Sequence, residues 1–128
     1  MVDQHKFAAG PYVSVWVGQH QSEEELDDYI FHRFSHEFRF RVDDHNLPET
    51  SVESEPVPPA KLIHGFSRHE KFQDGFIHAA EQLGIHAAQS VMVFYFLAYT
   101  PEGLSVAPKP EMTYVGNFWF EGIARPNE

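Results

Sequence analysis

The 128-residue sequence contains no cysteine, which excludes disulfide bonds, thiolate-bound metal ions and a cysteine nucleophile. It also lacks any apolar run close to the roughly 20 residues that a membrane-spanning helix needs. Its N-terminal residues, MVDQHKFAAGPY, do not include the apolar centre of a secretion signal. We therefore expect a cytoplasmic protein without a membrane partner.

The motifs of several enzyme classes are missing as well. No glycine-rich segment matches a phosphate-binding loop or a dinucleotide fingerprint, and no GxSxG motif presents a serine nucleophile. Adjacent carboxylates such as Asp27 and Asp28 lie among polar residues, which favours a solvated surface over an acid–base pair of unequal burial. The sequence predicts no catalytic residue and no cofactor.

Histidine is plentiful, with nine residues, but its spacing gives little indication of a metal site. His32 and His36 are four residues apart, a separation that can place two ligands on one helical face. Phe34 and Ser35 indicate that the helix is ending there, and a helix C-terminus favours histidine without any metal. We predict no metal ion, and a small histidine-using enzyme stays an alternative function.

Basic residues are few. Nine lysines and arginines stand against 19 aspartates and glutamates, which gives a formal net charge of −10. Twelve of the acidic residues fall within residues 1–55, together with four of the basic ones. This balance disfavours nucleic acid and anionic membranes as partners. Two interpretations remain: a well-solvated surface, or a surface that attracts a basic protein.

The segment VSVWVGQHQSEEELDDYI, residues 13–30, contains the clearest local pattern. Valines alternate with Ser14 and Trp16, which predicts a strand that ends at Gly18. Ser22 and Glu25 fit a capping box and predict that a helix begins here. Its apolar stripe consists of Leu26, Tyr29, Ile30 and Phe34. Capping uses one or two carboxylates, so the five acidic residues between positions 23 and 28 exceed what helix stability requires.

Four later segments complete the regular elements. Residues 37–42 alternate polar and apolar side chains and predict a half-exposed strand. A second capping box at residues 67–70 opens a helix that reaches about residue 83. Residues 91–99 are apolar on both faces and predict a central strand, and residues 112–120 predict the last strand.

Residues 43–61 have a different composition, with five acidic residues and four prolines. Proline removes a backbone donor and fixes its own φ, so this composition predicts an extended, acidic proline-rich loop. The element order is then β-α-β-α-β-β in a single domain of residues 1–128.

This order predicts an α+β fold, a two-layer sandwich in which two helices pack on one face of a roughly four-stranded sheet. The opposite face would carry Trp16 and other aromatic side chains, which is more apolar surface than a solvated face normally has. Residues 52–63 folded back as a lid, a second copy in a homodimer, or a partner protein would each cover it.

Three parts of the chain resemble a known family. VSVWVG followed by SEEEL and Tyr29 is similar to the start of the immunity protein 22 family, small bacterial proteins associated with polymorphic toxin systems. YVGNFWF, residues 114–120, resembles the closing strand of that family, and the helix at 68–83 with the apolar strand after it matches its middle. Between Phe34 and Phe66 the chain departs from the family, because it is rich in proline there.

The resemblance implies a protein without catalytic activity that binds and neutralises a cognate bacterial toxin, for example a basic nuclease. An acidic surface would then attract the toxin and cover its active site. The candidate contact residues are Glu23, Glu24, Asp27, Asp28, Asp43, Asp44, Glu49, Glu53 and Glu55. Trp16 is the candidate aromatic anchor, and Trp119 is a weaker one because it fits a core position better. A housekeeping interaction domain without a toxin is the other alternative.

Overall fold

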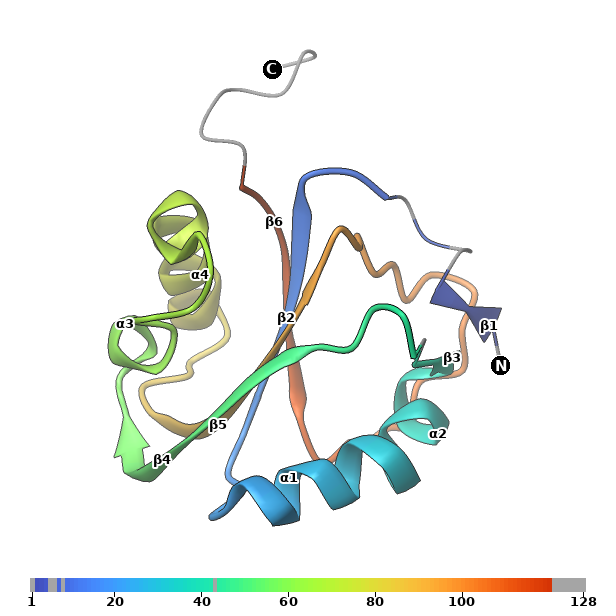
Figure 1. Ribbon diagram of the computed structural model, residues 1–128, viewed down its shortest axis with the longest axis horizontal. Coiled ribbons are helices and arrows are strands. Elements are labelled where there is room, and N and C mark those ends of the chain that lie inside the picture. The colour runs from blue at the N-terminus through green and yellow to red at the C-terminus, as the bar shows by residue number, and fades with distance from the viewer. Residues whose placement is uncertain (1, 5–6, 8, 43, 121–128) are drawn as a thin grey trace.

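The computed structural model describes residues 2–4, 7, 9–42 and 44–120 (Figure 1). In chain order the elements are β1 (Val2–Asp3), β2 (Tyr12–Gly18), α1 (Glu23–Tyr29), the π-helical turn η2 (Ile30–Phe34), α2 (Ser35–Phe38), β3 (Phe40–Arg41), β4 (Glu49–Val57), α3 (Pro59–Leu62), α4 (His69–Gln82), β5 (Ala88–Tyr95) and β6 (Thr113–Trp119). Within these described ranges, none of the helices has the length and apolar character needed to cross a membrane.

The main sheet has four antiparallel strands in the order β4-β5-β2-β6, and β1 and β3 form a separate parallel pair. β2 and β5 lie in the centre and pair without interruption from Val13–Tyr95 to Gly18–Ser90. β5 is buried on both faces along nearly its whole length, which explains why residues 91–94 are apolar without alternation. The predicted α+β class with a four-stranded sheet is confirmed.

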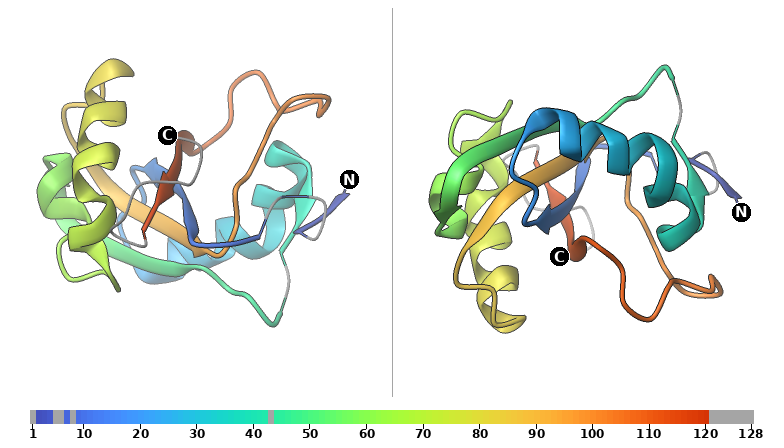
Figure 2. Two further views of the ribbon diagram at one scale, coloured as in Figure 1. Left: turned by 90° about the horizontal axis from the view of Figure 1, so that it is seen from above. Right: turned by 90° about the horizontal axis from the view of Figure 1, so that it is seen from below.

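Helices cover both faces of this sheet (Figures 1 and 2). On one face Val13, Val15 and Val17 belong to a core with Phe72 and Phe76 of α4. On the opposite face Trp16 belongs to a second core with side chains of α1, η2 and α2. The prediction that both helices share one face is therefore corrected: successive residues of β2 point to opposite faces, and each face has its own helical layer.

Aromatic side chains fill the core beneath α1, η2 and α2. Trp16 is 0% exposed, and its indole ring meets Phe34, Phe38 and Phe94 edge-on at centroid distances of 5.1, 5.5 and 5.7 Å. Edge-on contacts are favoured by the electrostatics of aromatic rings. Trp16 is a core residue, so its assignment as an anchor for a partner is wrong. Trp119 is half-buried and packs edge-on against Tyr12.

The predicted strand at residues 37–42 is reduced to β3, because α2 occupies Ser35–Phe38. Phe34 and Phe38 are four residues apart, so a helical turn places both rings in the same core. Arg39 then ends α2 with a left-handed φ of 67°. The pattern from Glu37 to Val42 fits a strand equally well, and packing around Trp16 decides between the two.

β4 lies inside the predicted loop of residues 43–61, and that prediction is wrong for Glu49–Val57. The strand pairs with β5 from Glu49–Val93 to Val52–Ser90, and its register then shifts before the Val57–Ala88 pair. The prolines do not prevent this, because Pro56 falls in the irregular part and β4 is an edge strand.

α4 begins at His69 without the side-chain cap that the sequence pattern predicts. Arg68 precedes it in the left-handed region, with a φ of 57°. The Ser67 hydroxyl instead donates to Glu49 of β4, so a tertiary contact replaces the local cap.

Replacing Trp16 by alanine should lower the free energy of unfolding by about 3–5 kcal/mol, because a fully buried indole leaves a cavity. Urea unfolding followed by circular dichroism measures this change. Trp16→Phe should cost less, since a ring remains and the lost indole N–H has no hydrogen-bond partner among the described residues. Leu83→Ala, at a half-exposed position, is the control and should stay within about 0.5 kcal/mol. Equal costs for Trp16→Ala and Leu83→Ala would contradict the core assignment.

Candidate functional site

The predicted acidic residues of α1 lie on the molecular surface. Ser22 Oγ accepts a hydrogen bond from Glu25 N at 3.1 Å, and Glu25 Oε2 accepts one from Gln21 N at 2.9 Å, so the predicted capping contacts are largely present. This cap accounts for Glu25 alone. The remaining four carboxylates are exposed, and they belong to Glu23, Glu24, Asp27 and Asp28.

The acidic residues predicted in the 43–61 segment do not form a single surface. Asp44 and Glu55 are exposed, Glu53 is half-buried, and Asp43 lies outside the described residues. The Glu49 carboxylate accepts hydrogen bonds from Tyr95 Oη at 2.9 Å and from Ser67 N at 3.2 Å. Burial and this contact with Glu49 raise the pKa of Tyr95. Glu49 therefore joins β4 to β5 and to the start of α4, and its carboxylate is engaged within the chain.

An apolar cluster that the sequence analysis missed lies between η2 and the start of β4. Phe31 is 62% exposed and Leu47 is 50% exposed. A shallow cavity of about 180 Å³ is lined by Asp27, Ile30, Phe31, Leu47, Pro48 and Thr50. Neighbouring exposed apolar side chains are typical of interaction surfaces. The exposure of Phe31 could have been predicted from the sequence, because Phe31 does not fall on the apolar stripe of the first helix.

A second cavity, of about 460 Å³, shares Leu47 and Pro48 with the first. Its lining includes Phe96, 56% exposed, and the buried ring of Phe120, over which the Arg68 guanidinium lies at 5.3 Å. Phe96 has a φ of 61°, and Arg68 is also left-handed, a conformation that bulky residues rarely adopt. Such backbone strain is concentrated at functional sites. We call the two cavities, with Phe31, Leu47 and Phe96, the Leu47 surface.

α1 and β4 meet beside this surface. Thr50 Oγ1 of β4 donates to Glu23 Oε2 of α1 at 3.4 Å. Asp27 lines the smaller cavity directly. The structure therefore brings the acidic face of α1 next to the exposed apolar side chains, although the two are separated in the sequence.

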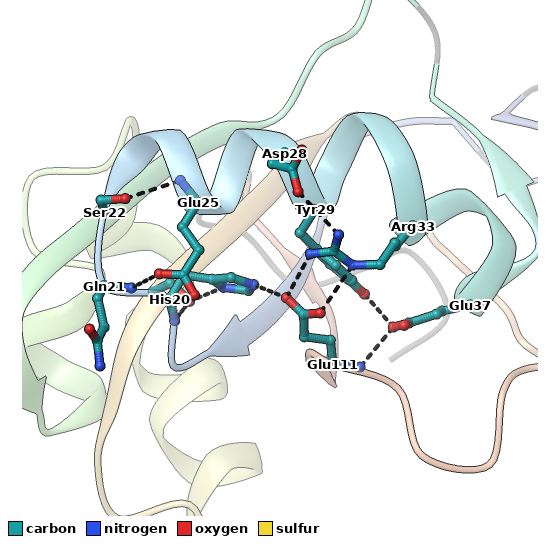
Figure 3. A network of polar contacts seen from close by, with 10 residues as sticks. His20, Gln21, Ser22, Glu25, Asp28, Tyr29, Arg33, Glu37 and Glu111 are labelled. Carbon is teal, nitrogen blue, oxygen red and sulfur yellow. Dashed lines mark hydrogen bonds and ion pairs between the residues drawn. The ribbon is translucent and has the colours of Figure 1, made fainter.

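A network of polar contacts holds the other side of α1 (Figure 3). His20 is 3% exposed; its Nδ1 lies 2.8 Å from Ser90 Oγ, and its Nε2 lies 2.5 Å from Glu111 Oε2. Arg33 Nε donates to Glu111 Oε1 at 3.2 Å, and its Nη1 donates to Asp28 Oδ2 at 3.1 Å. These contacts connect the end of β2, the helical layer and the connection between β5 and β6.

Glu37 extends this network. Its Oε1 accepts hydrogen bonds from Tyr29 Oη and from Glu111 N, both at 2.7 Å. Burial, the hydrogen bond to Glu37 and the charges of Glu37 and Glu111 raise the pKa of Tyr29. The carboxylates of Glu37 and Glu111 thus fix the connection before β6 against α1, η2 and α2.

The contacts of Ser90, His20 and Glu111 form a serine–histidine–carboxylate chain, a combination that hydrolases use. In this protein Ser90 is fully buried, so its hydroxyl faces no substrate. A polar cavity of about 260 Å³ lies beside the chain and is lined by Gln19, His20, Glu25, Arg33 and Glu111. Sequence reasoning missed it because His20 and Glu111 are 91 positions apart.

The histidines that the structure describes do not converge on a metal site. Among the residues placed by the structure, no three histidine or carboxylate side chains are arranged to hold a metal ion. His32 Nε2 instead lies 3.7 Å from Asp28 Oδ1, on the exposed face of α1 and η2.

Comparison with known proteins identifies no relative: no family model, no curated protein and no solved structure matches the chain.

Raising the pH above about 10 should destabilise the protein, because several tyrosines have raised pKa values in the folded state. Burial raises the pKa of Tyr99 to about 12, and that of Tyr29 is also raised. Below pH 10 both states keep these protons, so the contribution to stability is complete. Above pH 10 the unfolded chain releases them first, and the free energy of unfolding falls. Denaturant titrations from about pH 8 to pH 12 measure the decline.

The variant Tyr29→Phe isolates the contribution of Tyr29 to this pH dependence of stability. At pH 8 it should cost about 1–3 kcal/mol, because the Glu37 carboxylate loses a donor. Its decline above pH 10 should be shallower than that of the parent chain, since one raised pKa has been removed. A decline identical to the parent's would contradict the contribution of Tyr29.

Proposed function

We propose that this chain is an immunity protein that binds and neutralises a cognate bacterial toxin in the cytoplasm, without catalysis. The proposal is supported chiefly by one observation: exposed carboxylates of α1 lie beside the exposed apolar side chains of the Leu47 surface. Protein interfaces combine an apolar centre with a polar rim, and aromatic residues in the centre supply much of the binding energy. Phe31 and Leu47 would form the centre, and Glu23, Glu24 and Asp27 the rim.

The negative charge of the chain supports the proposal that its partner is basic. The chain has a formal net charge of −10. In the described part of the chain, Asp28 is the one α1 carboxylate of the four that is in an ion pair, with Arg33 at 3.1 Å. Glu23, Glu24 and Asp27 therefore keep their charge available for attraction over longer distances. Such a field accelerates the association of a basic protein and weakens as salt is added.

Glu24→Lys combined with Asp27→Lys should slow association with the cognate toxin about tenfold at low ionic strength, because it reverses the field of α1. The difference should shrink as salt is added. The toxin is obtained by co-expressing the product of the neighbouring gene and recovering its complex with this chain. Stopped-flow association at several salt concentrations then gives the rates.

The matched control reverses the same number of charges on the opposite face of the sheet, with Asp74→Lys and Glu81→Lys on α4. Both residues are exposed, and they change the net charge equally. The α4 pair should slow association much less than the α1 pair. Equal slowing by both pairs would show that net charge alone acts, and no slowing by either would rule out electrostatic attraction through α1.

Phe31→Ala should accelerate dissociation of the same complex about tenfold, because an aromatic side chain is removed from the centre of the interface. The stability of the free chain should change little, since Phe31 is 62% exposed. Leu83→Ala serves as the control, because Leu83 is similarly exposed but lies at the end of α4, on the opposite face of the sheet. Equal dissociation rates for the two variants would remove Phe31 from the interface.

A second candidate function, a small hydrolase, is favoured by the convergence of His20, Glu111 and Arg33 on one polar cavity. The buried position of Ser90 weighs against it, because a nucleophile must reach its substrate. Turnover of an ester or phosphate panel that disappears in His20→Ala would favour this candidate. A bound partner that is not a toxin would instead favour a housekeeping interaction domain.

A further inference from the structure

β4 has an open side. It is an edge strand that pairs with β5, and Figures 1 and 2 show no described helix or strand across its outer side. Among the described residues, no backbone hydrogen bond joins 49–52 to a segment other than β5. An edge strand in regular register presents N–H and C=O groups with which another chain can pair.

Only the first half of β4 has the regular register that such pairing requires. Glu49 to Val52 lie opposite Val93 to Ser90 without a break. Beyond Val52 the register shifts, and Pro56 lacks a backbone donor. The stretch that can accept another strand is therefore residues 49–52, directly after Leu47 and Pro48.

The smaller cavity of the Leu47 surface lies beside this stretch. It is lined by Pro48 and Thr50 from the β4 side and by Ile30 and Phe31 from the helical side. Thr50 pairs with Met92, which belongs to the Trp16 core, so Thr50 is on the face of the sheet that α1 covers. An added strand would direct alternate side chains to this same face, towards the cavity.

The charges around the edge favour a basic occupant. Asp27 lines the cavity, Glu23 contacts Thr50, and Glu55 is exposed further along β4. A second copy of this chain would bring these carboxylates close to their counterparts, and like charges brought together across an interface repel one another. A segment rich in lysine or arginine would be attracted by the same residues.

We propose that the partner adds a strand to β4: an extended basic segment pairs with residues 49–52 and places one apolar side chain in the cavity between α1 and β4. In this mode backbone hydrogen bonds supply affinity, and the pocket for an alternate side chain supplies specificity. The inference rests on the proposed function for the basic character of the partner. Strand pairing at β4 is the additional claim.

A display library of random peptides as long as β4 is the probe, selected on the full chain. Enriched peptides should combine basic residues with an apolar residue at a fixed position. In a paired peptide strand, every second amide faces β4 and the others face away. In synthetic versions, N-methylation of the amides that face β4 should weaken binding about tenfold or more, and N-methylation of the others should have little effect. Equal effects of both sets, or no enrichment, would overturn strand pairing.

Hydrogen exchange locates the bound peptide. The outward-facing amides among residues 49–52, which do not bond to β5, should exchange more slowly in the complex. Glu23→Lys should weaken binding of the peptide, whereas Glu81→Lys should not. Protection of α1 without protection of β4 would overturn strand pairing and leave the proposed function standing. A chain that sediments as a dimer, and becomes monomeric when peptide is added, would assign the edge to a second copy and overturn the basic occupant.

If the toxin from the co-expressed complex binds but leaves residues 49–52 unprotected, the strand proposal fails and the proposed function survives. If peptides protect these residues but no basic toxin is recovered from the host, the edge is a binding site and the immunity function fails. The two failures are therefore distinguishable.

Discussion

The two-sided burial of β2 is the constraint on which the rest of the structure depends. Its alternation directs Val13 and Val15 towards α4, and it directs Ser14 and Trp16 towards the other helical layer. Both faces of β2 carry apolar side chains, and burying them supplies much of the free energy that stabilises a small domain. The chain therefore needs helices on both sides. Ser14 is accommodated because its hydroxyl donates to Leu97 O at 2.6 Å, which satisfies a buried polar group.

The layer over Trp16 fixes the orientation of the acidic helix. Leu26 and Tyr29 of α1 belong to the aromatic core, so the carboxylates between them must face solvent. The contacts of Arg33 and Glu37 with the connection before β6 hold this layer from the side. Acidic residues that repel one another in an isolated helix are thus tolerated, because packing and ion pairs stabilise the helix on which they lie.

The candidate binding surface arises where this layer meets the edge of the sheet. η2 changes the winding of the helix, and Phe31 within it is exposed while Phe34 is buried. β4 brings Leu47 and Pro48 to the same place from the other side. An acidic rim, exposed apolar residues and an open strand edge therefore coincide, and each favours contact with another protein by a different physical interaction.

The sequence by itself determined β2, most of α1, α4, β5 and β6, because their hydrophobic periodicity, and in α1 the capping residues, act over a few positions. It also determined that the α1 carboxylates are exposed, since the apolar stripe leaves them no place in the core. Only the tertiary structure decided that Trp16 is buried, that β4 is a strand rather than a loop, and that His20 meets Glu111. Each depends on which distant segment lies opposite, and local periodicity contains no information on that pairing. The prolines of residues 43–61 hid β4 from sequence-based prediction. Proline argues against a central strand, but it is compatible with an edge strand such as β4.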